Sequence, residues 1–317
     1  MTLSANLRIA GLIVIGLVPL LASAAPPAKH EEKGQTFQAP SATLYVEVLG
    51  TAPGVPLIVV NGGPGFDHTY EHIAMPGTTS AWETLARRRR VVFYDQRGNG
   101  RSGALKPGQT CGLADQIADL EAVRAHLGVE QIDLLGHSWG GFLVMAYAAR
   151  YPQHIRHLVT VDSAAPKWGD TVFLFKDIFP EGMERSDSYA FGDALGDKAA
   201  SDAGIREYLQ WLFYSPEKRD AFVAQITPGV YTKEVNQTVE HDVERFDLNP
   251  EIRKYKFPTL IVTGRYDINV APSVAWKMHK AIAGSQFAVF EKSGHLPFYE
   301  EPEAFVRTLE AFLGGGR

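Results

Sequence analysis

Cysteine is nearly absent from this sequence of 317 residues, in which Cys111 is the single example. An internal disulfide is therefore excluded, even in an oxidising compartment. No histidine or evident helix N-terminus near Cys111 in the sequence would activate its thiol, so we do not expect a cysteine nucleophile. A chain of this length can bury a core large enough to fold without cross-links.

An excess of positive charge is also missing. The chain has 31 Lys and Arg against 36 Asp and Glu, with a formal net charge of −5. Nucleic-acid binding needs a basic face. The one basic cluster, Arg87 to Arg90, directly precedes the apolar residues Val91 to Phe93 and is interpreted as the solvated start of a strand. We therefore expect no nucleic-acid partner.

Long hydrophobic runs are scarce. The longest, Ile9 to Leu21, is short for a bilayer-spanning helix and is followed by Ala22-Ser23-Ala24, the small-x-small pattern of a signal-peptidase site. Residues 1–24 are predicted to be a signal peptide cleaved after Ala24. The mature protein would then be periplasmic or secreted, without a stable membrane anchor. An uncleaved anchor is the alternative. Residues 25–35 resemble a disordered leader.

Strand and helix patterns alternate along most of the chain. Short apolar runs bounded by turn residues predict strands, and a spacing of three or four between apolar residues, as in residues 113–127, predicts helices. This alternation indicates an α/β fold with a mostly parallel sheet covered by helices on both faces. The predicted core comprises residues 36–165 and 251–317. Residues 166–250, rich in aromatic and acidic residues but without a clear buried strand, are predicted to form a helical cap.

The sequence Gly136-His137-Ser138-Trp139-Gly140 matches G-x-S-x-G between an apolar strand and a helix, the context in which this motif forms a nucleophile elbow. The alternative is a purely structural turn. A serine hydroxyl is a weak nucleophile and needs a general base. His295, which follows a late strand, is the candidate base.

An acid that orients the base is expected between the serine and the histidine in the sequence. Asp267 and Asp162 each follow an apolar strand. We favour Asp267, because it directly precedes the histidine strand. Its role would be to hold the imidazole tautomer and to stabilise the imidazolium that forms. For either aspartate, the alternative is a turn or helix cap.

A strand ending in "LIVV" runs directly into Asn61-Gly62-Gly63-Pro64-Gly65. A tetrahedral oxyanion needs two preorganised N–H donors. We predict that the backbone N–H groups of Gly63 and Trp139 supply them, since glycines allow the backbone to approach a substrate closely. The alternative is an ordinary Gly/Pro turn.

Taken in order, "NGGPGFDHTY", "YDQRGNGRS", "GHSWGG", "GRYD" and "SGH" resemble the α/β-hydrolase superfamily, and more narrowly its proline iminopeptidase (prolyl aminopeptidase) branch. The resemblance implies an α/β-hydrolase fold with a helical cap, a Ser138–Asp267–His295 triad and no cofactor. It also implies that Asp95 and Arg97 form structural pairs rather than taking part in chemistry.

The sequence departs from the family pattern in two respects. The family usually begins its oxyanion loop with histidine, whereas this sequence has Asn61, whose side chain can also hydrogen-bond neighbouring backbone. The resemblance further implies acidic residues that hold a substrate's free amine. The cap offers many acids, among which Glu234 and Glu240 are weak candidates for substrate binding.

The residues 68–72 match H-x-x-E-H, a zinc-peptidase pattern in which His68 and His72 bind the metal and Glu71 is the base. That chemistry needs a long helix and a third ligand, so histidines in packing or at a pocket rim are the favoured interpretation. No metal is expected to be required.

The sequence therefore predicts an exported serine hydrolase that acts on a small peptide or ester, with release of N-terminal proline as the favoured activity. A carboxylesterase, lactonase or acyltransferase would use the same triad. A non-catalytic binding module on the same scaffold is a further alternative.

Overall fold

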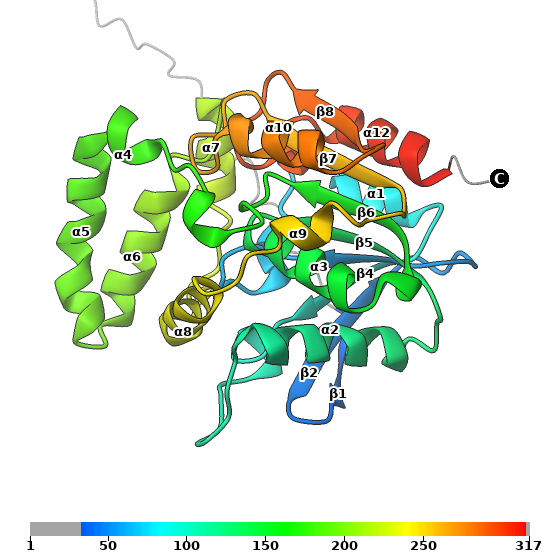
Figure 1. The fold of residues 1–317 in the computed structure, drawn as a ribbon. Coiled ribbons are helices and arrows are strands. Elements are labelled where there is room, and N and C mark those ends of the chain that lie inside the picture. Colours follow the sequence, from blue (N-terminus) through cyan, green and yellow to red (C-terminus); the bar gives the residue numbers. More distant parts are fainter. Residues whose placement is uncertain (1–32, 315–317) are drawn as a thin grey trace, which may run out of the picture.

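A computed structural model describes residues 33–314 of the chain (Figure 1). The predicted signal peptide, most of the predicted leader and the last three residues lie outside this range. Within residues 33–314, no helix combines the length and the apolar character needed to cross a membrane.

The sheet contains eight strands in the spatial order β1-β2-β4-β3-β5-β6-β7-β8. The strands β1 and β2 pair antiparallel, as do β2 and β4, and all other neighbouring pairs are parallel. The strand bounds are Gln35–Gln38 (β1), Thr43–Leu49 (β2), Leu57–Val60 (β3), Val91–Asp95 (β4), Ile132–His137 (β5), Ile155–Val161 (β6), Thr259–Gly264 (β7) and Gln286–Phe290 (β8). This confirms the predicted α/β architecture.

One boundary differs from the prediction. Gln35, expected to end a disordered leader, is the first residue of β1 and pairs with Val46. The segment Gln35–Gln38 is short and has Phe37 as its single apolar residue, so its sequence carries little hydrophobic signal. Its strand conformation follows from pairing with β2 at the edge of the sheet.

Alternation of side chains along the strands divides the core into two layers. In β3, Ile58 and Val60 join a cluster with the helices α2 (Leu113–His126) and α3 (Trp139–Arg150), whereas Leu57 and Val59 join the opposite cluster. That second cluster includes residues of α1 (Ala81–Ala86) and α12 (Pro302–Gly314). Both sheet faces are thus covered, as expected for buried parallel strands.

Between β6 and β7 the chain forms a series of helices, most of which lie beyond the carboxyl ends of the parallel strands, whereas the last of them packs against α3 (Figure 1). Their bounds are Phe175–Ile178 (α4), Pro180–Ala194 (α5), Lys198–Leu209 (α6), Pro216–Val223 (α7), Lys233–Val243 (α8) and Asn249–Ile252 (α9). The remaining elements are α10 (Pro272–Ala281), α11 (Pro297–Glu300) and the 3-10 turns η1 (His68–His72), η2 (Gly100–Ser102), η3 (Pro152–His154) and η4 (Trp168–Asp170).

The crossing of β5 and α3 leaves no room for side chains at two glycines. A Cβ on Gly140 would lie 2.1 Å from the carbonyl oxygen of Val60, and one on Gly136 would lie 2.2 Å from the carbonyl oxygen of Gly140. These distances are far below van der Waals contact. The glycines therefore allow α3 to begin directly against the ends of β3 and β5.

We expect Gly140→Ala to lower the free energy of unfolding by about 1–3 kcal/mol, because the added methyl group meets rigid backbone. The matched control is Gly169→Ala, whose added methyl group would have no neighbour within 4 Å. Urea denaturation of both variants measures the difference. Equal stability of the two variants would contradict the packing argument.

Candidate active site

Ser138 occupies a strained turn between β5 and α3. Its backbone angles are φ 55° and ψ −118°, and it is one of two described residues other than glycine with positive φ. Such angles are rare for residues with a Cβ and are often retained for function. The N–H of Ser138 donates to the carbonyl oxygen of Val161 at 2.9 Å, which ties the turn to β6. The side chain lines a pocket at the end of the sheet.

His295 lines the same pocket, and its Nδ1 lies 2.7 Å from Oδ2 of Asp267. The other carboxylate oxygen of Asp267 accepts hydrogen bonds from the N–H groups of Asn269 and Val270, at 2.8 and 2.9 Å. Because Asp267 accepts the proton on Nδ1, the Nε2 of a neutral His295 carries the lone pair that a general base needs.

The rival acid, Asp162, lies beside this pair but has a different role. It follows β6 with φ 45°, and its Oδ1 accepts the N–H of Gly264 at 2.8 Å. One ligand atom each from Asp162, Asp267 and His295 lies within 4.8 Å of the others. Burial and the neighbouring Asp267 carboxylate raise the pKa of Asp162 well above its ordinary range. Asp162 therefore lies beside the Asp267–His295 pair, with its Oδ1 held by the backbone at the end of β7.

Burial sets the protonation of the histidine. His295 is 2% exposed, and desolvation of its charged form lowers its pKa below the ordinary value of 6.5. Burial also raises the pKa of Asp267, while its hydrogen bonds with Val270, Asp162 and Asn269 oppose that rise. At neutral pH the imidazole is consequently uncharged and able to accept a proton.

The glycine-rich loop after β3 lies opposite Ser138. Gly63 has φ 124° and lines the pocket, and the Gly63–Pro64 peptide bond is cis. The N–H of Gly62 donates to the Tyr70 hydroxyl at 2.6 Å, so this donor is already engaged. Trp139 begins α3, and the first N–H groups of a helix have no acceptor within the helix. The loop and the helix thus bring both predicted oxyanion donors to one region.

Asn61 holds the shape of this loop. Its Nδ2 donates to the carbonyl oxygens of Phe66 at 2.7 Å and Gly62 at 3.2 Å. Gln96 donates to the backbone oxygen of Asn61 at 3.0 Å and accepts the indole N–H of Trp139 at 2.9 Å. The expected hydrogen bonding of Asn61 to neighbouring backbone is confirmed, and the interactions of Gln96 connect the loop to the start of α3.

The loop after β4 is structural, as expected. Arg97 forms a bidentate pair with Asp119, with donor–acceptor distances of 2.6 and 2.7 Å. Asp95 accepts the N–H groups of His68 at 3.0 Å and Arg101 at 2.7 Å. The buried side chains of Asp95 and Arg97 therefore hold the loop in place, and neither of them lines the pocket that contains Ser138.

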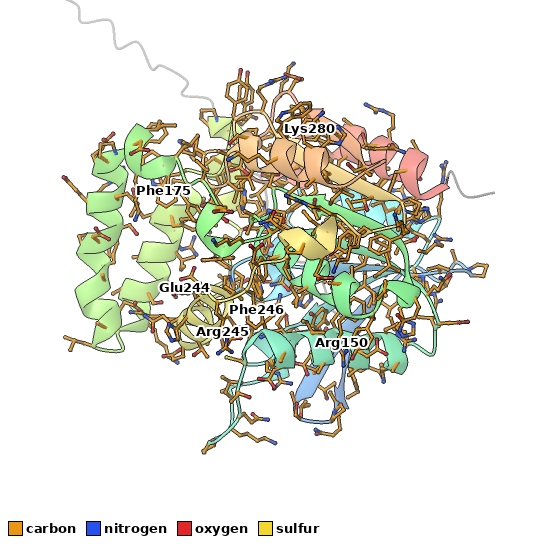
Figure 2. The ribbon with its side chains drawn as sticks, in the orientation of Figure 1. Arg150, Phe175, Glu244, Arg245, Phe246 and Lys280 are labelled. Atoms are coloured by element: carbon orange, nitrogen blue, oxygen red, sulfur yellow. The ribbon has the colours of Figure 1, made fainter. Side chains whose placement is uncertain are left out.

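A wider cavity of about 640 Å³ extends from Ser138 into the helices between β6 and β7. Phe175, labelled in Figure 2, contributes to its wall from α4. Glu240 of α8 also lines the cavity, and burial raises the pKa of its carboxyl group. Glu234, the other acid considered from sequence, is exposed and is not among the lining residues.

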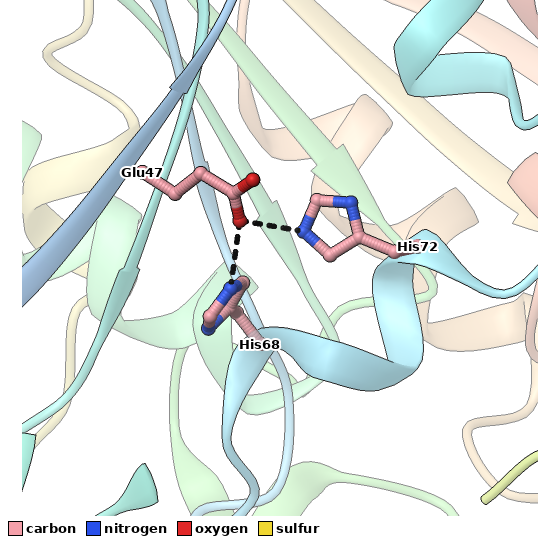
Figure 3. A group of neighbouring side chains, drawn as sticks. All are labelled: Glu47, His68 and His72. Carbon is pink, nitrogen blue, oxygen red and sulfur yellow. Dashed lines mark hydrogen bonds and ion pairs between the residues drawn. The ribbon is translucent and has the colours of Figure 1, made fainter. Parts of the chain in front are cut away.

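The H-x-x-E-H residues do not form the helix that a zinc peptidase needs. They make up the single 3-10 turn η1, and both histidines face Glu47 rather than Ser138 (Figure 3). Glu71 is buried elsewhere, with its carboxylate 4.0 Å from Nδ1 of His137. This geometry does not support a water nucleophile activated by Glu71.

Three contributors to the site were missed in the sequence. Tyr70 joins the Gly62 N–H to Nδ1 of His137, which lies 2.7 Å from its hydroxyl. Nε2 of His137 is 2.9 Å from the carbonyl oxygen of His295. The Nδ2 of Asn269 lies 3.1 Å from Nε2 of His295. No sequence pattern marks these contacts, because they join segments that are distant along the chain or reach back around a turn.

Comparisons with known proteins agree with this fold. Residues 55–302 match the family model described as alpha/beta hydrolase fold. The proline iminopeptidase of Lactobacillus helveticus is 31% identical over 289 residues, covering 85% of this chain and 93% of the relative. The proline iminopeptidase of Lactobacillus acidophilus is 30% identical over 277 residues, with 81% and 89% coverage.

Solved structures show the same fold. An esterase from Exiguobacterium antarcticum aligns with a TM-score of 0.68 at 24% identity, covering 89% of this chain and all of that one. An alpha/beta fold family hydrolase from Bacillus anthracis aligns with a TM-score of 0.72 at 20% identity, covering 89% and 99%. The chain therefore belongs to the alpha/beta hydrolase fold family, in the branch that contains the proline iminopeptidases.

Proposed function

We propose that this protein is a serine hydrolase that releases N-terminal residues, proline by preference, from short peptides through an acyl-enzyme. The observation that carries the proposal is that a strained Ser138 and His295 line one pocket, while Nδ1 of His295 contacts Asp267. The relatives named proline iminopeptidases support the choice of substrate class.

In the proposed mechanism, Ser138 Oγ attacks the scissile carbonyl while Nε2 of His295 takes its proton. For this step the lone pair of Nε2 must face Oγ, in place of its contact with Asn269. The N–H groups of Gly63 and Trp139 stabilise the oxyanion, and Asp267 stabilises the imidazolium. His295 then protonates the leaving amine, and water hydrolyses the acyl-enzyme.

The pocket beside Ser138 suits a small apolar group. Its volume is about 30 Å³, which is room for about two water molecules. Its apolar wall is formed by Phe66, Tyr70, Leu209, Leu212, Phe222 and Leu296. A compact ring such as that of proline fits this description better than a long or charged side chain. Glu240 lines the wider cavity that begins at Ser138. We propose that its carboxylate binds the substrate's free amine.

The same triad can hydrolyse esters, so a carboxylesterase, lactonase or acyltransferase is the alternative. Cleavage of an ester but not of an amide would favour it. Labelling of Ser138 by a fluorophosphonate would exclude the binding-module alternative. For location, we propose cleavage after Ala24 and a periplasmic or secreted mature enzyme, which N-terminal sequencing of the exported protein would test.

Ser138→Ala is expected to abolish hydrolysis of proline β-naphthylamide while leaving the fold intact, because no other group replaces the nucleophile. Activity of the mature chain and the variant should be measured beside p-nitrophenyl acetate, with circular dichroism as the check on folding. Full amide hydrolysis by the folded variant would refute the mechanism.

The pH dependence of kcat/KM should report His295. As pH falls through the pKa of His295, the imidazole gains a proton and can no longer act as the base, so activity is lost on the acid side. Because burial lowers that pKa, the midpoint of the acid limb should lie below 6.5. A midpoint at or above 6.5, measured where circular dichroism shows a native fold, would contradict this assignment.

Glu240→Gln should lower kcat/KM for proline β-naphthylamide by about tenfold or more, since a charge-assisted hydrogen bond to the amine would be lost. Hydrolysis of p-nitrophenyl acetate, which lacks an amine, should change little. The matched control is Glu234→Gln on the exposed side of the same helix. Equal amide kinetics for the two variants would remove Glu240 from the proposal.

A further inference from the structure

A second cluster of potential ligands lies in the core, apart from the serine pocket. Glu47 comes from β2, and His68 and His72 come from η1, immediately after the glycine-rich loop (Figure 3). Their exposures are 1%, 0% and 7%. None of the three lines the pocket that contains Ser138. We call these residues the β2–η1 cluster.

The two histidines converge on one carboxylate oxygen. Nε2 of His68 is 3.2 Å from Oε2 of Glu47, and Nε2 of His72 is 3.5 Å from the same atom. One ligand atom from each of the three residues lies within 4.8 Å of the others. Zinc bonds of about 2.0–2.1 Å at tetrahedral angles separate neighbouring ligand atoms by about 3.3–3.4 Å. The two measured distances bracket that separation.

The outer contacts also match those of a metal-binding histidine. Nδ1 of His68 lies 2.6 Å from Oδ1 of Asp95. The backbone N–H of His68 also donates to Oδ1, and that of Arg101 donates to Oδ2, so both carboxylate oxygens are held. A carboxylate on Nδ1 fixes the ring orientation and leaves Nε2 free of a proton when a metal is bound. Asp95 therefore supplies the second carboxylate of a carboxylate–histidine–metal arrangement.

Charge balance favours a cation at this place. The carboxylates of Glu47 and Asp95 are almost fully buried, and they lie 3.2 and 2.6 Å from the two ring nitrogens of His68. A divalent ion bound to neutral imidazoles would compensate the charge of these two buried carboxylates.

We propose that Glu47, His68 and His72 bind one divalent transition-metal ion, with Zn²⁺ best matched by the nitrogen and oxygen donors. The ion would be structural, because it would join η1 to β2 rather than face the substrate. Its effect on the active site would pass through Tyr70 of η1, which contacts Gly62 and His137. This structural role differs from that of a zinc peptidase with an H-x-x-E-H motif, in which Glu71 would act as a base.

The test uses the mature full chain after treatment with a chelator and dialysis. Isothermal titration with Zn²⁺ and elemental analysis after gel filtration should show one equivalent bound. With a water molecule as the fourth ligand, Co²⁺ bound to the three residues should give the visible spectrum of tetrahedral coordination. The affinity should fall with falling pH, because protons compete with the ion for the ligand nitrogens and oxygen.

Variants locate the ion. His72→Gln should weaken Zn²⁺ binding at least tenfold, and Asp95→Asn should weaken it by about 10–100-fold. His154→Gln, a change far from the cluster in the fold, should retain wild-type affinity. His295→Gln should also retain the bound equivalent, which excludes an ion held by the Asp162–Asp267–His295 group.

Failure to bind one equivalent in the wild-type chain would overturn the proposal, as would equal affinity in His72→Gln and His154→Gln. Loss of the equivalent in His295→Gln alone would place the ion at the catalytic group and also overturn it. If His72→Gln does not fold, the Co²⁺ spectrum of His295→Gln decides, since tetrahedral coordination there supports the cluster and its absence refutes it.

Discussion

The close packing of α3 against β5 is the constraint on which the candidate site depends. With glycine at 136 and 140, the two backbones approach so closely that a Cβ would overlap a carbonyl oxygen. The chain must therefore reverse between strand and helix within a single residue, and Ser138 takes the positive φ that this reversal requires. The same turn places the first residue of α3, Trp139, directly after the serine. The proposed nucleophile and one proposed oxyanion donor thus depend on one local geometry.

Parallel strand alignment supplies the remaining groups. Ser138, Asp162, Asp267 and His295 follow β5, β6, β7 and β8, which are neighbours in the sheet. Because parallel strands end at the same edge, residues more than 150 positions apart meet there. The helices between β6 and β7 then secure the arrangement. The carbonyl oxygen of Leu212 accepts the N–H of His295 at 2.7 Å, and Glu300 accepts the N–H groups of Gly294 and Tyr214 at 2.6 and 3.0 Å.

Two buried histidines, His295 and His68, have opposite pKa shifts because their neighbouring carboxylates differ. His295 faces a carboxylate whose negative charge is already satisfied by backbone N–H groups, and desolvation lowers its pKa and keeps it neutral. His68 lies between two carboxylates, whose hydrogen bonds outweigh desolvation and raise its pKa. The first environment suits a general base. The second suits a cation, either a proton or the metal ion that we propose. Both histidines are almost fully buried. The two environments therefore differ chiefly in how many carboxylates contact the histidine.

The sequence alone determined the fold class, the elbow around Ser138 and the glycine loop, because each depends on local patterns: apolar periodicity, a strand–turn–helix motif and residues that permit unusual backbone angles. It favoured Asp267 over Asp162 as the acid and left β1 unmarked, since a four-residue edge strand with one apolar residue carries little hydrophobic signal. Tertiary structure decided that Asp267 contacts His295 while Asp162 lies beside this pair, and that Glu240 rather than Glu234 lines the cavity. It also decided that His68 and His72 meet Glu47 from another part of the chain. Each of these outcomes depends on contacts between distant segments, and spacing along the chain does not encode such contacts.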